Sequence, residues 1–394
     1  MLQLNGNTLL FNFPEVHPDA QLSISFERTC RIPDDGKTYP LPASLGRFPL
    51  RHVDDYRKRV PIDWDMRGGV MLPMYQSEAM WLHFKPKIVR DRRHAGSLKY
   101  PFAVKIAAGK QSAVTGDTWT KKLKKGDYLV CPPQQWLDGF VVEEGVIRQF
   151  VAMPLGMGVT VEEQLTGEAE WGGLQIEVLP MKRDEFERRF PKPPPSPLRG
   201  VEVWDGRIGG QLRRSRRALT AHSLSTAKGR EVNYSCDSIN VISDTSERWD
   251  SDDSVAVAAD MGLGAGGTMK QDIKKDPYGK DAWQRKCDGR RCYIHLANSL
   301  AWRAITGEMP PTAPLTAKDY KKAGFPWFDL YEDGLDAVKA KSKLKSVQSV
   351  MQFGFQHGVP TLPENKSVKV KRVHMLRPEP AKGSEAAIRE GDWA

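Results

Sequence analysis

Short apolar or alternating segments, separated by turn-forming residues, recur through the first half of the chain. Residues 22–26 read Leu-Ser-Ile-Ser-Phe, and this alternation of apolar and polar positions has the period of a half-buried β-strand. Further strands are predicted at residues 70–74, 102–107, 128–131, 147–153, 174–179 and 292–296. Gly, Pro and Asp residues lie between them and favour turns. The pattern predicts a β-rich α+β fold of mostly antiparallel short strands, sandwich- or barrel-like, and not a doubly wound sheet.

The same pattern divides the chain into four parts. Residues 1–183 are predicted to form a β-rich block, and residues 184–255 a proline-rich linker followed by a largely disordered insertion, because few apolar residues occur there. Residues 256–375 are predicted to form an α+β block that packs on the first, and residues 376–394 a polar tail. Helices are expected at residues 184–189, 316–322 and 335–350.

An internal repeat is one interpretation of a paired signature. Thr-Gly-Asp at 115–117, Asp-Tyr at 127–128 and Trp-Leu-Asp at 136–138 have counterparts at 306–308, 319–320 and 327–329, with similar spacing. The alternatives are chance similarity and two similar units related by a pseudo-twofold axis.

Composition adds a basic charge to this picture. The formal net charge is +10, and three lysine- or arginine-rich clusters contribute to it. The first comprises Lys121, Lys122, Lys124 and Lys125, the second Arg213, Arg214, Arg216 and Arg217, and a third extends from Lys85 to Arg93. They predict weak, non-specific binding of polyanions such as nucleic acids, although solvated surfaces and a basic linker explain them more simply.

Other features bear on the compartment. No apolar run reaches the roughly 20 residues that span a bilayer, and the first residues lack the pattern of a signal peptide. The five cysteines do not form a disulfide framework. We therefore expect a cytoplasmic protein, with a homo-oligomer as one option.

A glycine-rich segment offers the sharpest match to a cofactor motif. Gly262, Gly264 and Gly267 fit the G-x-G-x-x-G pattern of dinucleotide-binding loops. The context differs from that motif, because neither a long helix nor a further strand ending in an acid follows. A structural turn or bulge is the favoured interpretation, and no cofactor is expected.

Candidate catalytic residues are few. Cys287 and Cys292 flank an Asp-Gly hairpin signal, and their spacing does not favour a metal site, so none is predicted. His295 follows the second cysteine. An acidic cluster at Glu162, Glu163, Glu168 and Glu170 contains carboxylates that could act in pairs, although a solvated edge is the simpler explanation.

Eleven tryptophans, several in turn-like contexts, suggest a further possibility. Trp136 and Trp327 are candidates for an aromatic platform that stacks on sugars, bases or prolines, whereas burial in the core is the more common role.

Several strings form a recognisable set, notably IRQFVAMPLG at 147–156, MGLGAGG at 261–267 and WRAITGE at 302–308. Together they resemble a family of uncharacterised microbial proteins. The resemblance implies no activity, catalytic residue or cofactor. The leading hypothesis is therefore a non-enzymatic β-rich binding or assembly protein. The alternatives are an enzyme of unrecognised type that uses His295 or the Glu162–Glu170 cluster, and a nucleic-acid-associated factor.

Overall fold

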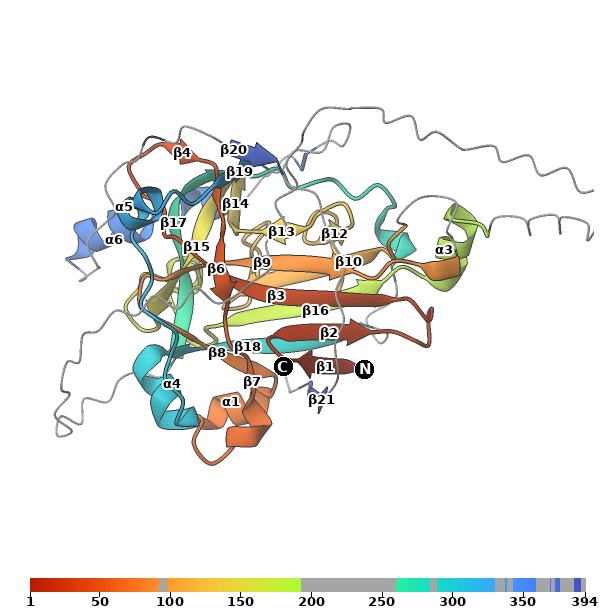
Figure 1. Cartoon of the computed structure of the whole chain (residues 1–394), viewed down its shortest axis with the longest axis horizontal. Coiled ribbons are helices and arrows are strands. Elements are labelled where there is room, and N and C mark those ends of the chain that lie inside the picture. Colours follow the sequence, from red (N-terminus) through yellow and green to blue (C-terminus); the bar gives the residue numbers. More distant parts are fainter. Residues whose placement is uncertain are drawn as a thin grey trace, which may run out of the picture. The chain divides into compact units, whose positions relative to one another are not determined.

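The larger of two β-sheets supplies most of the ordered structure (Figure 1). The computed structural model describes residues 1–91, 98–192, 260–283, 289–329, 337–338, 343–358, 369, 373–375 and 386–390, and all structural statements concern these residues. The larger sheet contains β1 (Leu2–Asn5), β2 (Thr8–Asn12), β3 (Gln21–Thr29), β4 (Thr38–Tyr39), β6 (Ser44–Arg47), β7 (Arg51–His52), β8 (Val70–Met74), β9 (Ala79–Pro86), β10 (Phe102–Ala108), β11 (Gln111–Ser112), β12 (Leu129–Cys131), β13 (Trp136–Leu137), β14 (Gly139–Glu143), β15 (Val146–Pro154), β16 (Leu174–Pro180), β17 (Asp260–Lys270), β18 (Arg290–Asn298) and β21 (Ala386–Ala387). The smaller sheet contains β5 (Leu41–Pro42), β19 (Trp327–Asp329) and β20 (Val373–Met375).

Antiparallel pairs of long strands dominate the larger sheet. The pairs β3–β9, β10–β16 and β15–β17 each extend over seven or more residue partners. Strand β17 pairs with β15, and β18 pairs with β16 and, in parallel, with β8. The segments on either side of residues 193–259 therefore share one sheet. The chain has the predicted β-rich α+β fold, a large antiparallel sheet with few helices.

Strand β3 shows how the sequence pattern produces the core. Leu22, Ile24 and Phe26 are fully buried, and they lie on the face that contributes to the main hydrophobic cluster. Ser25 and Glu27 alternate with them and so lie on the opposite, polar face, because successive strand side chains point to opposite faces.

The helices are short and lie around the sheet. They are η1 (Val53–Tyr56), α1 (Ile62–Arg67), α2 (Val161–Thr166), α3 (Arg183–Arg189), η3 (Lys280–Ala282), α4 (Ser299–Thr306), α5 (Ala317–Lys322), η5 (Lys343–Ser346) and α6 (Val350–His357). Helices α3 and α5 match the predicted segments within one residue. No helix of the described residues is long and apolar enough to cross a membrane.

The predicted α-helix at 335–350 is wrong at every described residue before Val350. Residues 343–346 form a 3₁₀ helix, and α6 begins only at Val350. Ser349 is the reason, because its hydroxyl accepts the Gln352 N–H while the Gln352 side chain accepts the Ser349 N–H. This capping box starts a helix and prevents one from running through residue 349.

The proposed internal repeat also needs correction. In the proposed repeat, Asp319 and Tyr320 lie inside α5, whereas Asp127 and Tyr128 lie in a loop before β12, so the two copies differ in secondary structure. Within residues 376–394, which the sequence predicts to be a polar tail, β21 pairs with β1 and Ile388 is buried. The proline-rich run from residue 193 and the insertion at 205–253 lie outside the described residues.

Candidate functional site

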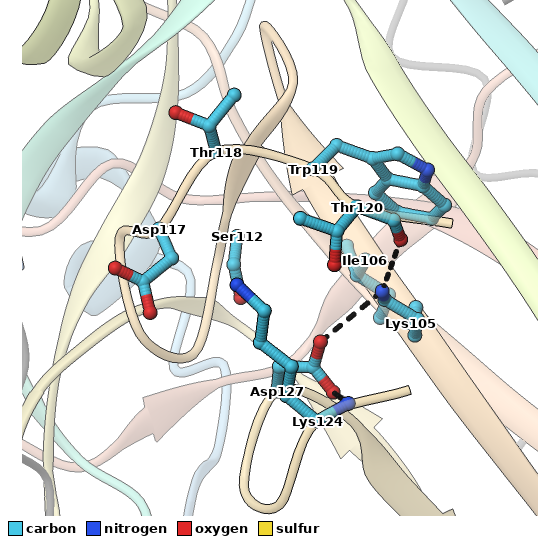
Figure 2. A pocket seen from close by; sticks show the side chains of 9 residues that line it. All are labelled: Lys105, Ile106, Ser112, Asp117, Thr118, Trp119, Thr120, Lys124 and Asp127. Carbon is cyan, nitrogen blue, oxygen red and sulfur yellow. Dashed lines mark hydrogen bonds and ion pairs between the residues drawn. The ribbon is translucent and has the colours of Figure 1, made fainter. Parts of the chain in front are cut away.

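A buried lysine anchors the loop that carries the first basic cluster. We call residues 118–127 the lysine loop. Lys105, on β10, donates from its ammonium to the backbone oxygens of Thr120 at 2.8 Å and Lys122 at 3.2 Å, and pairs with the Asp127 carboxylate at 3.1 Å. Figure 2 shows the ammonium between Thr120 and Asp127, with Trp119 beside it. The indole ring of Trp119 lies 4.7 Å from the same nitrogen, a cation–π distance.

The ion pair is almost completely removed from water. The side chains of Lys105 and Asp127 are 4% and 8% exposed. Burial raises the pKa of Asp127, while Lys105 and the backbone N–H of Lys124 oppose that change by stabilising the carboxylate. The pair therefore works as an internal clamp, which fixes both ends of the lysine loop to β10.

The lysines of the loop reach solvent, and Lys124 also lines a small cavity under the loop. Lys121, Lys122, Lys124 and Lys125 are all exposed, and none lies within ion-pair distance of an acidic group of the described residues. The nearby acids are already engaged: Asp127 by Lys105, and Asp117 by Lys343 at 2.8 Å. The structure thus leaves four positive charges of this loop facing solvent.

A small cavity lies under the loop. Ser112, Thr118, Trp119, Lys124 and Asp127 are among its lining residues (Figure 2). Its volume is about 10 Å³, which is room for the centre of one water molecule and too little for a substrate. The outer surface of the loop, and not this cavity, is the part that can meet a partner.

His295, a candidate in the enzyme hypothesis, is held inside the protein. It is 1% exposed and stacks between the rings of Trp64 and Tyr293, at 4.7 and 4.4 Å. Its Nε2 lies 2.9 Å from the backbone oxygen of Gly68. Burial lowers its pKa to about 3, so the imidazole is neutral and bonded to backbone. This arrangement supports a packing role.

The acidic cluster divides into two buried anchors and two surface residues. Glu162 accepts the backbone N–H groups of Glu170, Trp171 and Gly172 at 2.7–3.0 Å. Glu163 accepts those of Gly156, Gly158 and Thr160 at 2.8–3.1 Å. These two glutamates are 3% and 8% exposed, so the expectation of a solvated edge is wrong for them. Glu168 and Glu170 are exposed, as a solvated edge requires.

The buried Glu162 carboxylate depends on its N–H donors and on the space that Gly109 leaves for it. Burial raises its pKa, whereas the three N–H donors lower it by stabilising the charged form. A side chain at Gly109 would place its Cβ 2.1 Å from Glu162 Oε2, so only glycine fits beneath the carboxylate. Both glutamates hold loops in place and have no exposed oxygen pair to offer a substrate.

The glycine-rich segment is a strand and contains a bulge. Gly262, Gly264 and Gly267 lie in β17, and the register against β15 shifts between the pairs Arg148–Thr268 and Phe150–Ala265. Added Cβ atoms would meet Thr160 and Val350 side chains at 2.7 Å for the first two glycines, and the Pro33 backbone oxygen at 2.3 Å for the third. Close packing of chain segments on β17 therefore accounts for these residues.

The two tryptophans proposed as a platform lie in different sheets. Trp327, on β19, is 5% exposed and packs against Tyr39 and Tyr320. Trp136, on β13, lies beside Trp81 and His83 of β9. Trp136 thus belongs to a separate aromatic group.

The remaining candidates add no metal site. Among the described residues, no three His, Cys, Asp or Glu side chains converge as metal ligands, and Cys30, Cys131 and Cys292 are buried free thiols. Cys287 and the arginines at 213–217 lie outside the described residues.

Sequence reasoning missed Lys105, Trp119 and Asp127 as the support of the basic cluster. A signal for Lys105 was present, because a single lysine stands in the apolar strand Phe-Ala-Val-Lys-Ile-Ala-Ala. A buried charge in such a strand needs a partner. Comparison of the chain with protein-family models, curated protein sequences and solved structures gave no match. The function is therefore inferred from the residues and their geometry.

Proposed function

We propose that the protein is a non-enzymatic binding protein whose lysine loop holds an anionic polymer, with nucleic acid as the representative partner. The observation that carries the proposal is the set of four exposed loop lysines whose neighbouring acids are engaged elsewhere. An ammonium group is a strong, compact partner for phosphate, sulfate or carboxylate oxygens.

The loop is organised before any partner arrives. Its backbone is tied to β10 by Lys105, and the N–H of Trp119 donates to the Lys110 oxygen at 2.7 Å. Binding to a prearranged loop costs less conformational entropy than binding to a flexible one. The lysines themselves keep their side-chain freedom, which suits contacts with a backbone of repeating charges and gives no readout of base sequence.

The magnitude follows from counterion release. Four lysine–phosphate contacts on duplex DNA give a slope of log K against log salt of about −3.6. We expect a loop variant with Lys121, Lys122, Lys124 and Lys125 changed to Gln to lose most of that slope.

A matched control removes the same charge elsewhere. Lys58, Lys318, Lys321 and Lys322 are exposed, so their change to Gln lowers the net charge equally. The test measures binding of a fluorescent 20-base-pair duplex, and of heparin as a second polyanion, by anisotropy over a range of salt. If both variants weaken binding equally, net charge and not the loop is responsible. If neither variant changes it, the proposal is wrong.

A further inference from the structure

A row of polar and aromatic side chains crosses three strands on the polar face of the larger sheet. Ser25 of β3 pairs with His83 of β9, and His83 pairs with Trp136 of β13. In the next row Glu27 pairs with Trp81. Side chains two residues apart on a strand share a face, so all five lie together. We call them the tryptophan–histidine face.

The aromatic rings of this face are in contact with one another. His83 stacks on Trp136 with a centroid distance of 5.6 Å and an interplanar angle of 12°. Trp81 lies 5.9 Å from His83 and 6.3 Å from Trp136, tilted by 59° to each. Trp81 and His83 are half-buried, so the group reaches the surface.

The polar atoms of these rings have no hydrogen-bond partner within the described residues. The indole N–H of Trp81 is buried and unpaired. His83 makes ring contacts, but neither imidazole nitrogen forms a hydrogen bond with any described group. Buried polar groups in native proteins are nearly always paired, and an unpaired one points to a missing water, ion or ligand.

The carboxylate of Glu27, which lies beside these rings, is held by hydrogen bonds, and charged side chains lie around it. Glu27 accepts the hydroxyls of Ser25 and Ser44, each at 2.7 Å, and the Arg47 guanidinium at 3.2 Å. Desolvation, with Lys85, Arg47 and Lys99 nearby, lowers the pKa of His83 to about 4 although Glu27 opposes the change. The imidazole is therefore neutral near pH 7, and its two nitrogens offer one donor and one acceptor.

These groups define the chemistry of a partner. It must enter beside Trp81 to accept a hydrogen bond from the buried indole N–H, exchange both kinds of bond with an imidazole, and pack an apolar face against aromatic rings. A hydroxyl group both donates and accepts, and a sugar ring combines hydroxyl edges with C–H faces that pack on indoles. We propose that the tryptophan–histidine face binds a saccharide. This site is separate from the lysine loop and does not depend on it.

Two substitutions test the site without removing its packing. Trp81→Phe deletes an N–H that has no partner in the protein, and His83→Phe keeps a stacked ring but deletes both nitrogens. Neither change breaks a hydrogen bond of the described residues, so thermal midpoints should stay within about 2 °C of wild type or rise. Trp81→Phe should weaken saccharide binding about tenfold, the effect of one lost hydrogen bond, and His83→Phe, which loses a donor and an acceptor, about tenfold to a hundredfold.

The probes are cellohexaose, maltohexaose, chitohexaose and hexagalacturonate, titrated by isothermal calorimetry. At least one should bind wild type saturably, and the acidic probe shows whether Lys85, Arg47 and Lys99 add affinity. His52→Phe, at a half-buried histidine on β7, is the matched control and should bind as wild type does. The proposal is overturned if no probe saturates by about 10 mM, or if the two variants bind as tightly as wild type. A Trp81→Phe variant that unfolds would show that its N–H is paired in solution, which also overturns it.

Discussion

Replacing Lys105 by Met should destabilise the protein strongly, because the change leaves a carboxylate buried without its cation. Asp127 is 8% exposed; its Oδ2 loses the ammonium, while its Oδ1 keeps the hydrogen bond from the Lys124 N–H. The ammonium also satisfies two backbone oxygens, of Thr120 and Lys122, which lose their donor. Removal of one member of a buried ion pair costs about 3–5 kcal/mol, and we expect a value in that range.

The assay is urea unfolding followed by tryptophan fluorescence, with Asp127→Asn and the double variant completing a thermodynamic cycle. We expect the double variant to be more stable than the sum of the single effects predicts, by about 2 kcal/mol, because it leaves no unpaired charge. Lys343→Met is the control. Its pair with Asp117 is 65% and 42% exposed, so its loss should cost less than about 1 kcal/mol.

Acid should partly rescue the Lys105→Met variant. The pKa of Asp127 is already raised by burial, and loss of the cation raises it further. A carboxyl whose folded pKa lies above its unfolded value costs stability once pH rises above the unfolded value, and that cost disappears on protonation. The difference from wild type should therefore shrink as pH falls. Additive single effects, or a Lys105→Met variant within 1 kcal/mol of wild type, would refute the clamp.

Two further predictions concern other buried carboxylates. Burial raises the pKa of Asp138 to about 7, although a hydrogen bond from Gln271 opposes the change, so the charged carboxylate costs the folded state more stability as pH rises. Asp138→Asn should therefore gain roughly 3 kcal/mol in free energy of unfolding relative to wild type between pH 5 and pH 8. Urea unfolding at each pH measures this difference, and a constant difference would contradict the assignment. Glu162→Gln keeps one of two oxygens that accept three backbone N–H groups and should lower the free energy of unfolding by about 2 kcal/mol or more, whereas an unchanged midpoint in the same assay would argue against an anchoring role.

The seven strand segments predicted from apolar or alternating runs all overlap strands of the structure, because such runs supply the buried side chains of the core, whereas many of the shorter strands were not predicted. Residues 70–74 coincide with β8, and residues 174–179 fall within β16. The helices predicted at residues 184–189 and 316–322 correspond to α3 and α5. The prediction of a helix over 335–350 failed because the Ser349 capping box was overlooked, although it is visible in the sequence as Ser-x-x-Gln.

The candidate sites depend on contacts between residues that are distant in the sequence, and the sequence pattern does not predict such contacts. Nothing local shows that the Glu162 carboxylate faces the N–H groups of residues 170–172, or that Lys105 reaches Asp127. The group of Trp81, His83 and Trp136 arises from strand register across a connection of about fifty residues. The lysine cluster was visible at once, whereas its exposed orientation and its engaged acids depend on the fold.

The pairing of β17 with β15 has a consequence for how the chain is made. Pro154 of β15 meets Met261 of β17, and residues 181–259 connect β16 to β17. The length of a connection changes stability little, by about 0.6 kcal/mol per doubling. The connection has a larger effect on the time that passes between the synthesis of the two strands. At about 5–20 residues per second, a ribosome needs roughly 5–20 s to add the ninety or so residues between the end of β16 and the end of β17. Throughout that interval the edge of β15, an apolar strand, has no β17 to cover it, so nascent chains of this protein should depend on chaperones most at this stage.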